Sequence, residues 1–280
     1  MAEQRDRTPT LPQGTIGIPN YRITGTLGKG GVGVVYAAEQ IEPPMPVAIK
    51  VLHMSSPEAV ERFTAEAEIM MKLDHPSIAR VFATGEANGH PYIVMEHIDG
   101  VTLDVHTRTA QPPLADKLEL FARICDAVQY AHDEGVVHRD LKPANIMVRT
   151  NGGVAILDFG VARAGASART LQGDFLGTLM YMSPEQAAGR NRDVDERADI
   201  YSLGVILFEL VRGMTPYDLK GMHIAEAVRH IATQPPRLLG SPDRELDAIV
   251  AQTLSKRSAD RQRSAAELAR QVRAVIPAVT

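Results

Sequence analysis

The feature that most constrains this chain is an eight-residue segment, 138–145, which reads His-Arg-Asp-Leu-Lys-Pro-Ala-Asn. Two valines precede it and the strand-like Ile-Met-Val follows it, so its polar side chains lie between two apolar segments. An aspartate there can accept or orient a hydroxyl proton, a lysine can neutralise a moving phosphate, and an asparagine can ligate Mg²⁺. The spacing of Asp140, Lys142 and Asn145 therefore favours phosphoryl transfer.

A second acidic motif, Asp-Phe-Gly at 158–160, follows the apolar segment 154–157. That segment is typical of a short strand, and a carboxylate at the end of a strand is a hard oxygen ligand of the kind that Mg²⁺ prefers. Asp158 and Asn145 are therefore the predicted metal ligands.

A glycine-rich segment, Gly-Lys-Gly-Gly-Val-Gly at 28–33, fits the pattern G-x-G-x-x-G, which is a weak signal by itself. A dinucleotide-binding fold would continue into a helix, with an acidic residue about 20 positions on. Here a β-branched run follows instead, and Lys50 comes 17 residues after the last glycine. This context favours a strand–loop–strand hairpin whose backbone amides approach phosphates. A glycine-rich hairpin without a ligand remains open on this segment alone.

Lys50 ends the strand-like Val-Ala-Ile-Lys, and a helix is predicted soon after it, with Ser56 as N-cap and a proline at its first position. One face of this helix is apolar and consists of Val60, Phe63, Ala67, Met70 and Leu73. Glu66 lies on the same face, where a carboxylate is costly unless it is paired, and Lys50 is the natural partner. A solvated Lys50 and an exposed Glu66 remain alternatives.

The order of the predicted elements divides the chain into two lobes. Short β-branched runs with one inserted helix extend from 21 to 98, and mainly helical patterns extend from 99 to 276. We expect residues 1–20 to form a flexible arm, because they are polar and contain prolines, and residues 277–280 to form a tail. The fold class is therefore α+β, with a small, mainly β lobe and a larger, mainly α lobe.

Composition and charge exclude several classes of protein. A net charge of −4 gives no general attraction to nucleic acid or to an anionic membrane. The single cysteine, Cys125, excludes an intramolecular disulfide, fits a reducing compartment and falls on an apolar helical stripe. The longest apolar stretch, 200–211, is too short to span a bilayer, and no secretory signal is evident. We expect a cytoplasmic location without membrane insertion. The alternative that the chain is the intracellular part of a longer membrane-anchored protein stays open.

Taken in order, the motifs between Gly28 and Arg261 resemble those of the eukaryotic-type protein kinase family, and most closely its bacterial serine/threonine branch. The resemblance implies the bilobal protein kinase fold, with an N-lobe and a C-lobe. It also implies an enzyme that transfers the γ-phosphate of ATP to serine or threonine hydroxyls of proteins. ATP and Mg²⁺, or Mn²⁺ in its place, are the implied cofactors. Protein substrates are the implied partners, and a homodimer that carries out autophosphorylation is left open.

Individual roles follow from the resemblance. Asp140 would be the catalytic base, and Lys50 would pair with Glu66 and with the α- and β-phosphates. Met95 would lie behind the adenine, whose edge would bind the backbone of Glu96 and His97, although Met95 also suits core packing. The catalytic set is Asp140, Lys142, Lys50 and Glu66, and the metal ligands are Asn145 and Asp158. The residues expected around the nucleotide are Leu27, Gly28, Gly30, Gly33, Val35, Ala48, Lys50, Met95, Glu96 and His97.

Other residues would support this set. Asp199 would be a buried acid that anchors the catalytic loop, and Arg261 would be the partner of Glu185. The activation segment holds two candidate phosphorylation sites, Thr170 and Ser167. The spacing to the Gly-Thr pair at 177–178 favours Thr170, and a hydroxyl that is never phosphorylated is the open alternative. Arg139 is placed to bind the phosphate.

Two positions depart from the family pattern: Ser183 stands where alanine is usual, and Leu-Met at 179–180 stands where a proline is common. A pseudokinase scaffold would lack a catalytic group, and a small-molecule phosphotransferase of similar fold would lack the Ser-Pro-Glu segment and its arginine partner. Both are weaker interpretations of this sequence, and a dehydrogenase fails on the context of the glycine loop. Three histidines lack metal-ligand spacing and are assigned no site: His75, His132 and His230.

Overall fold

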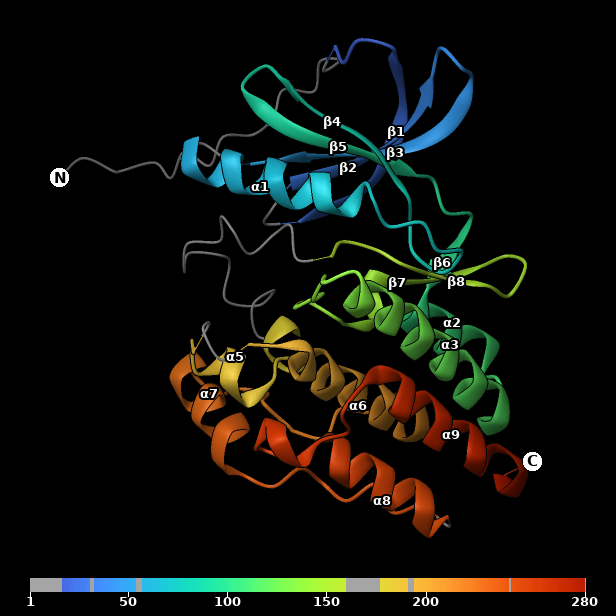
Figure 1. The fold of residues 1–280 in the computed structure, drawn as a ribbon, viewed down its shortest axis with the longest axis vertical. Helices are drawn as coiled ribbons and strands as arrows, with labels where there is room; N and C mark the ends of the chain where they lie inside the picture. The colour runs from blue at the N-terminus through green and yellow to red at the C-terminus, as the bar shows by residue number, and fades with distance from the viewer. Residues whose placement is uncertain are drawn as a thin grey trace, which may run out of the picture.

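The computed structural model of the chain describes residues 17–30, 33–53, 57–159, 177–190, 194–241 and 243–279. The side chains of residues 57–59, 62 and 66 lie outside this description. A strand-rich N-lobe lies above a larger helical C-lobe (Figure 1). The α+β, two-lobed fold class expected from the sequence is therefore the observed one.

The N-lobe is built on a five-stranded antiparallel sheet with the order β1-β2-β3-β5-β4. Helix α1 lies along one face of this sheet (Figure 1). The glycine-rich segment occupies the hairpin between the first two strands, which pair up to Gly30 and Gly33, as the sequence predicts. The elements are β1 (Tyr21–Gly30), β2 (Gly33–Gln40), β3 (Met45–Leu52), α1 (Pro57–Met70), β4 (Val81–Ala87) and β5 (His90–Glu96).

Strand β3 is buried on both faces, which explains why it reads as a continuous apolar run. Successive side chains point to opposite faces of a strand. Val47, Ile49 and Val51 pack in an outer cluster, whereas Ala48 and Leu52 join the core that continues into the C-lobe. We call the second side the inner face of the sheet. Lys50 alternates with the outer residues and therefore belongs to the inner face.

The C-lobe is organised around helix α6, whose residues 198–208 are all buried. The side chain of Asp195 caps the helix N-terminus, and Gly213 ends the helix with a φ of 68°. Helices α3 and α8 pack against α6. The helices are α2 (Leu103–Ala110), α3 (Leu114–Asp133), α5 (Pro184–Ala187), α6 (Glu196–Arg212), α7 (Ile224–Thr233), α8 (Arg244–Thr253) and α9 (Ala265–Val279), with 3₁₀ turns at Pro143–Asn145 and Ser258–Asp260.

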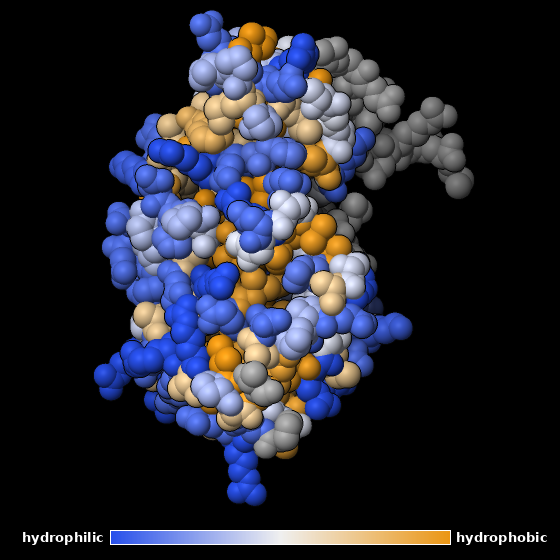
Figure 2. Space-filling model, turned by 90° about the vertical axis from the view of Figure 1, so that its right-hand side faces the viewer, coloured by the Kyte–Doolittle hydropathy of each residue, from blue (hydrophilic) through white to orange (hydrophobic). Residues whose placement is uncertain are grey.

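A small sheet lies at the junction of the lobes, with the order β6 (Gly100–Thr102), β7 (Ile146–Arg149) and β8 (Val154–Ile156) (Figure 1). Seen from the side on which β6 and α2 lie, hydrophobic residues show between polar ones over the middle of the surface (Figure 2). Within the described ranges, no helix combines the length and apolar character needed to cross a membrane.

The apolar faces predicted for two helices are buried in the structure. Phe63, Ala67 and Met70 are buried on α1, and Cys125 is fully buried on α3. Ser56 and residues 1–16 of the predicted arm lie outside the described residues. Ile18 is buried in the outer cluster, and α9 continues to Val279, so the structure extends beyond the boundaries that the sequence predicted at both ends.

We predict that Gly100→Ala destabilises the fold, because a Cβ there would collide with the backbone carbonyl oxygen of Val148 on the neighbouring strand. Overpacking of this kind costs about 1–3 kcal/mol, which corresponds to several degrees in melting temperature. The control is Gly25→Ala, since no atom lies within 4 Å of the Cβ that this substitution adds. Thermal unfolding of both variants is the measurement, and equal melting curves would contradict the collision.

Candidate active site

The strand pair β7–β8 brings Asn145 and Asp158 to the same place. Asn145 precedes β7 and Asp158 follows β8, and the antiparallel register pairs Ile146 with Ile156. The backbone N–H of Leu157 donates to the carbonyl of Asn145 at 2.8 Å. The two predicted metal ligands therefore lie at the same end of one hairpin.

The catalytic-loop residues form a connected polar group. The amide nitrogen of Asn145 donates to the backbone carbonyl of Asp140 at 2.8 Å and to its carboxylate at 3.0 Å. Lys142 Nζ lies 3.0 Å from the same carboxylate and donates to the hydroxyl of Thr178 at 3.1 Å. A carboxylate, a cation and a hydroxyl from the activation segment thus meet within one network.

Lys50 reaches across from the N-lobe to Asp158, with Nζ 2.7 Å from Oδ2. Burial by itself would raise the pKa of Asp158, but the charge and hydrogen bond of Lys50 outweigh it, so the pKa lies below its usual range. Asp158 has a φ of 54°, an unfavourable backbone conformation for a residue other than glycine. The predicted partner of Lys50, the Glu66 side chain, lies outside the described residues, and the contact with Asp158 is one that the sequence did not indicate.

The donor set at this place suits a magnesium ion shared with phosphate. Among the residues that the structure describes, no group of three or more histidine, cysteine or acidic side chains is arranged so that it could hold a metal ion. What is present is the ionised carboxylate of Asp158, together with an Asn145 whose amide nitrogen is engaged, which leaves its oxygen for a cation. Mg²⁺ commonly takes one or two such protein oxygens and completes its shell with water and phosphate.

Asp199 at the start of α6 holds the backbone of the catalytic loop. Its two carboxylate oxygens accept from the backbone N–H groups of His138 at 2.7 Å and Arg139 at 2.8 Å. The side chain is fully buried and also contacts His132 Nε2 at 2.9 Å. The sequence assigned His132 no role; its position on the buried stripe of α3, seven residues after Cys125, is the signal that could have found it.

His138 joins the catalytic loop to the metal-ligand strand. Its Nε2 lies 2.9 Å from the carbonyl oxygen of Leu157, and its ring packs against Phe159 with centroids 4.5 Å apart. Burial lowers the pKa of His138, so the neutral ring is favoured. The imidazole therefore acts as a structural link between the two motifs.

Four of the residues expected around the nucleotide lie on the inner face of the N-lobe sheet: Val35, Ala48, Lys50 and Met95. Ala48 pairs with Met95, and Lys50 pairs with Val35, which in turn pairs with Gly28. Directly opposite residues of neighbouring strands share a face of the sheet. Val35 on β2, Ala48 on β3 and Met95 on β5 therefore lie on the same face as Lys50. Leu27 is exposed, and His97 is half-buried beyond the end of β5.

Two of these positions have structural constraints of their own. A Cβ at Gly33 would collide with the carbonyl of Val51, so close packing against β3 already requires glycine there. Gly28 and Gly30 have open space around them. The backbone N–H of Glu96 donates to the carbonyl of Arg80 at 2.8 Å, so this N–H is already engaged within the protein.

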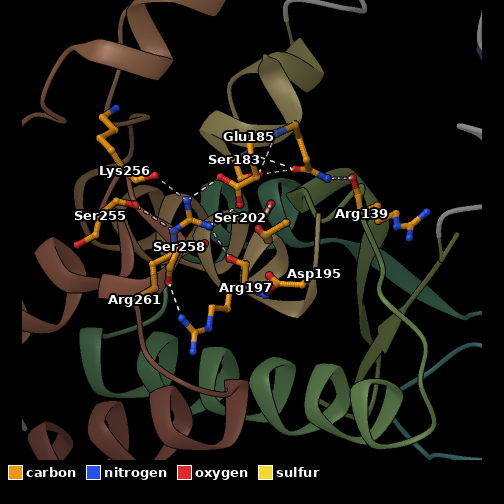
Figure 3. A network of polar contacts seen from close by, with 12 residues as sticks. Arg139, Ser183, Glu185, Asp195, Arg197, Ser202, Ser255, Lys256, Ser258 and Arg261 are labelled. Atoms are coloured by element: carbon orange, nitrogen blue, oxygen red, sulfur yellow. Dashed lines mark hydrogen bonds and ion pairs between the residues drawn. The ribbon is translucent and has the colours of Figure 1, made fainter. Parts of the chain in front are cut away.

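Arg261 and Glu185 form a buried ion pair that closes the C-lobe (Figure 3). Two parallel hydrogen bonds of 2.7 and 2.8 Å join the guanidinium to the carboxylate. The three remaining N–H groups donate to backbone carbonyls of Arg197, Ser255 and Lys256. Burial alone would raise the pKa of Glu185, yet the bonds from Arg261 lower it.

Ser183 has a structural reason to replace the usual alanine. Its hydroxyl and backbone form a capping box with Gln186 at the start of α5. The side-chain amide of Gln186 then donates to the backbone carbonyl of Arg139 at 3.0 Å, which ties the end of the activation segment to the catalytic loop (Figure 3). Sequence reasoning missed Gln186.

A cavity of about 440 Å³ lies between α2 and α6, with Pro143 and Glu209 in its lining. It is distinct from the contact between Lys50 and Asp158. The hydroxyl of Tyr181 donates to Glu209 at 2.6 Å, and burial raises the pKa of Glu209. No pattern in the sequence predicted this pair. Both candidate phosphorylation sites, Thr170 and Ser167, lie outside the described residues.

Comparisons with known proteins agree with this geometry. The family profile described as "Protein kinase domain" matches residues 21–272. Serine/threonine-protein kinase PknB of Mycolicibacterium smegmatis is 40% identical over 265 residues, which cover 89% of this chain and 41% of that protein. Serine/threonine-protein kinase Pkn1 of Myxococcus xanthus is 38% identical over 261 residues, covering 88% and 37%. The chain thus spans about two fifths of the curated relatives that it matches.

Among solved structures, the crystal structure of the PknI kinase domain from Mycobacterium tuberculosis superposes with a TM-score of 0.73 at 29% sequence identity. The match covers 94% of this chain and 98% of that one. The likeness therefore extends over both lobes.

We predict that Arg261→Ala lowers the melting temperature by several degrees or yields insoluble protein. Removing one partner of a buried pair strands the other charge at a cost of about 3–5 kcal/mol. The control is Arg257→Ala, because the ion pair of Arg257 with Asp260 is exposed to solvent. Because the pKa of Glu185 is lowered in the folded state, its contribution to stability is present at neutral pH and is lost as the pH falls through that pKa. A parent-like melting curve for Arg261→Ala would contradict this account.

Proposed function

Because the chain belongs to the protein kinase family, we propose that it is a serine/threonine protein kinase that transfers the γ-phosphate of ATP to serine or threonine hydroxyls of proteins. The observation that carries the proposal is Lys142, whose ammonium contacts both the carboxylate of Asp140 and the hydroxyl of Thr178. A cation held between a candidate base and the activation segment is suited to a phosphate that approaches a hydroxyl.

Each residue of the group has a chemical task in this proposal. Asp140 orients the acceptor hydroxyl and takes its proton, and Lys142 stabilises the charge on the transferring phosphoryl group. Asp158 and Asn145 hold Mg²⁺, which when bound neutralises phosphate oxygens. Mn²⁺ has the same oxygen preference and is the alternative metal.

The nucleotide is proposed to lie under the inner face of the N-lobe sheet. Val35 and Ala48 would cover the base, and Met95 would lie behind it. The amides around Gly28 and Gly30 would meet the phosphates, where the open space beside both glycines allows close approach. Lys50 would contact the α- and β-phosphates and pair with Glu66. A cytoplasmic location, where ATP is available, is part of the proposal.

A pseudokinase scaffold remains the alternative from another class, and it would bind nucleotide or partners without transfer. Against it stand the mutual contacts of Asp140, Lys142 and Asn145. The contact of Asp158 with Lys50 also speaks against it. Incubation with labelled ATP, Mg²⁺ and a generic protein acceptor separates the two, because only a kinase labels the acceptor.

Asp158→Asn should abolish transfer while leaving the fold intact, since charge neutralisation supplies most of the catalysis. We expect less than about 1% of the parent's phosphorylation of a generic acceptor at saturating ATP and Mg²⁺. The variant should still fold, because asparagine tolerates the positive φ of this position and keeps an oxygen acceptor for Lys50, although it loses the charge that pairs with this lysine. Asp116→Asn, at an exposed position in α3, is the matched control. Turnover above that level would remove Asp158 from the proposed metal site.

The proposal includes activation by phosphorylation of Thr170, with Ser167 as the second candidate. Arg139 supports it: its backbone is fixed by Asp199 and Gln186, whereas its side chain is exposed and points away from that network (Figure 3). No ion pair of Arg139 occurs within the described ranges. A phosphothreonine would add nearly two negative charges that a guanidinium can bind through two hydrogen bonds.

Mass spectrometry of protein incubated with ATP should find phosphate on Thr170 in the parent and none in Asp140→Asn. Thr170→Ala should reduce activity about ten- to a hundredfold, since each charge-assisted bond contributes about 1.5–3 kcal/mol. Ser167→Ala is the control. Full activity of Thr170→Ala would show that phosphorylation of Thr170 does not activate the enzyme.

A rate of autophosphorylation that rises more steeply than the protein concentration would support a homodimer.

A further inference from the structure

The two lobes are joined by a short connector, residues 97–99, between the end of β5 and the start of β6. In the proposed function this connector borders the base of ATP. Its position relative to the inner face of the sheet therefore decides how well the base fits.

The side chain of Glu96 leaves the sheet on the side away from the proposed nucleotide. Met95 pairs with Ala48 of the inner face, whereas Glu96 pairs with Val47 of the outer cluster. Consecutive residues of a strand point to opposite faces. A partner of this carboxylate thus acts on the connector from behind and has no direct contact with the nucleotide.

That partner is Arg149 of the C-lobe. Its guanidinium donates to the two carboxylate oxygens of Glu96 at 2.7 and 3.2 Å. The side chains are only 20% and 31% exposed, so solvent screens the pair incompletely. Such a two-bond contact fixes orientation as well as distance. The backbone of Arg80 is bonded to Glu96 through its own N–H and carbonyl, which holds the end of β5 in place.

The residue after Arg149 holds the other end of the connector. The backbone N–H of Thr150 donates to the carbonyl of Asp99 at 3.0 Å, and its hydroxyl donates to the Asp99 carboxylate at 3.2 Å. Arg149 and Thr150 therefore fasten both ends of residues 96–99 to the end of β7. Asn145, the proposed metal ligand, directly precedes the same strand.

We infer that Arg149 is a positioning residue for ATP, because its clamp on Glu96 fixes the connector relative to the metal-binding end of β7. The inference rests on the proposed function and deepens it. It assigns to the base of ATP a determinant that lies in the C-lobe, outside the residues that would touch the nucleotide.

The test compares Arg149→Met, Arg149→Lys and the exchanged pair Arg149→Glu with Glu96→Arg in steady-state assays. Methionine keeps the apolar stem without the charge, and lysine keeps the charge without the fork of donors. We expect Arg149→Met to raise the KM for ATP about three- to tenfold, which corresponds to the loss of one modest interaction. The kcat at saturating ATP and the KM for the protein acceptor should stay within about twofold. Arg149→Lys should fall between, and the exchanged pair should recover part of the loss.

Arg22→Met is the matched control, since Arg22 forms an exposed ion pair with Glu39 on the same lobe and should leave every constant unchanged. An unchanged KM for ATP in Arg149→Met, or a rise in kcat, would overturn the inference. The inference would also be overturned if Arg149→Met and the exchanged pair raised the KM for ATP equally and the KM for the protein acceptor rose by the same factor. A parent that neither binds nor uses ATP would instead refute the proposed function.

Discussion

The catalytic loop depends on one buried carboxylate. Asp199 has no exposed surface, and it accepts hydrogen bonds from two consecutive backbone N–H groups, those of His138 and Arg139. Arg139 has a φ of 64°, a conformation that costs free energy in a residue other than glycine. The hydrogen bonds to the carboxylate offset that cost. The loop must keep this conformation to donate both of them, and a buried charge without these donors would be strongly unfavourable. Helix α6, the most buried helix of the C-lobe, thereby sets the direction of the residues that follow, including Asp140.

Two further contacts carry this placement outward. The pair of Glu185 and Arg261 holds the end of the activation segment against the C-lobe, and Gln186 ties it back to the carbonyl of Arg139. Lys50 joins the N-lobe sheet to Asp158, so that the proposed metal-binding end of the hairpin contacts the strand proposed to cover ATP. Each of these groups is buried or half-buried, where Coulomb interactions are stronger than at the surface. The site is therefore held by polar contacts that bridge separate elements of the fold.

Much of this arrangement can be predicted from local patterns. The strand that contains Lys50, the apolar face of α1 and the hairpin around the glycines follow from local sequence patterns, and the structure has all three. The hydrogen bonds of Asn145 to Asp140 join residues only five positions apart. Other features needed the packed structure: the glycine at position 33 is required by the backbone of β3, and His132 is placed on Asp199 by the packing of α3 against α6.

The sequence by itself determined which chemical groups are present and in what order, because a motif such as 138–145 places its acid, cation and amide within a few residues of one another. The tertiary structure decided which distant groups become partners. Lys50 meets Asp158, Arg149 meets Glu96 and Gln186 meets Arg139 across long stretches of chain. Those choices depend on how sheets and helices pack, and small shifts in packing change which oppositely charged groups lie within about 3 Å. Periodicity along the chain contains no information on distances of that kind.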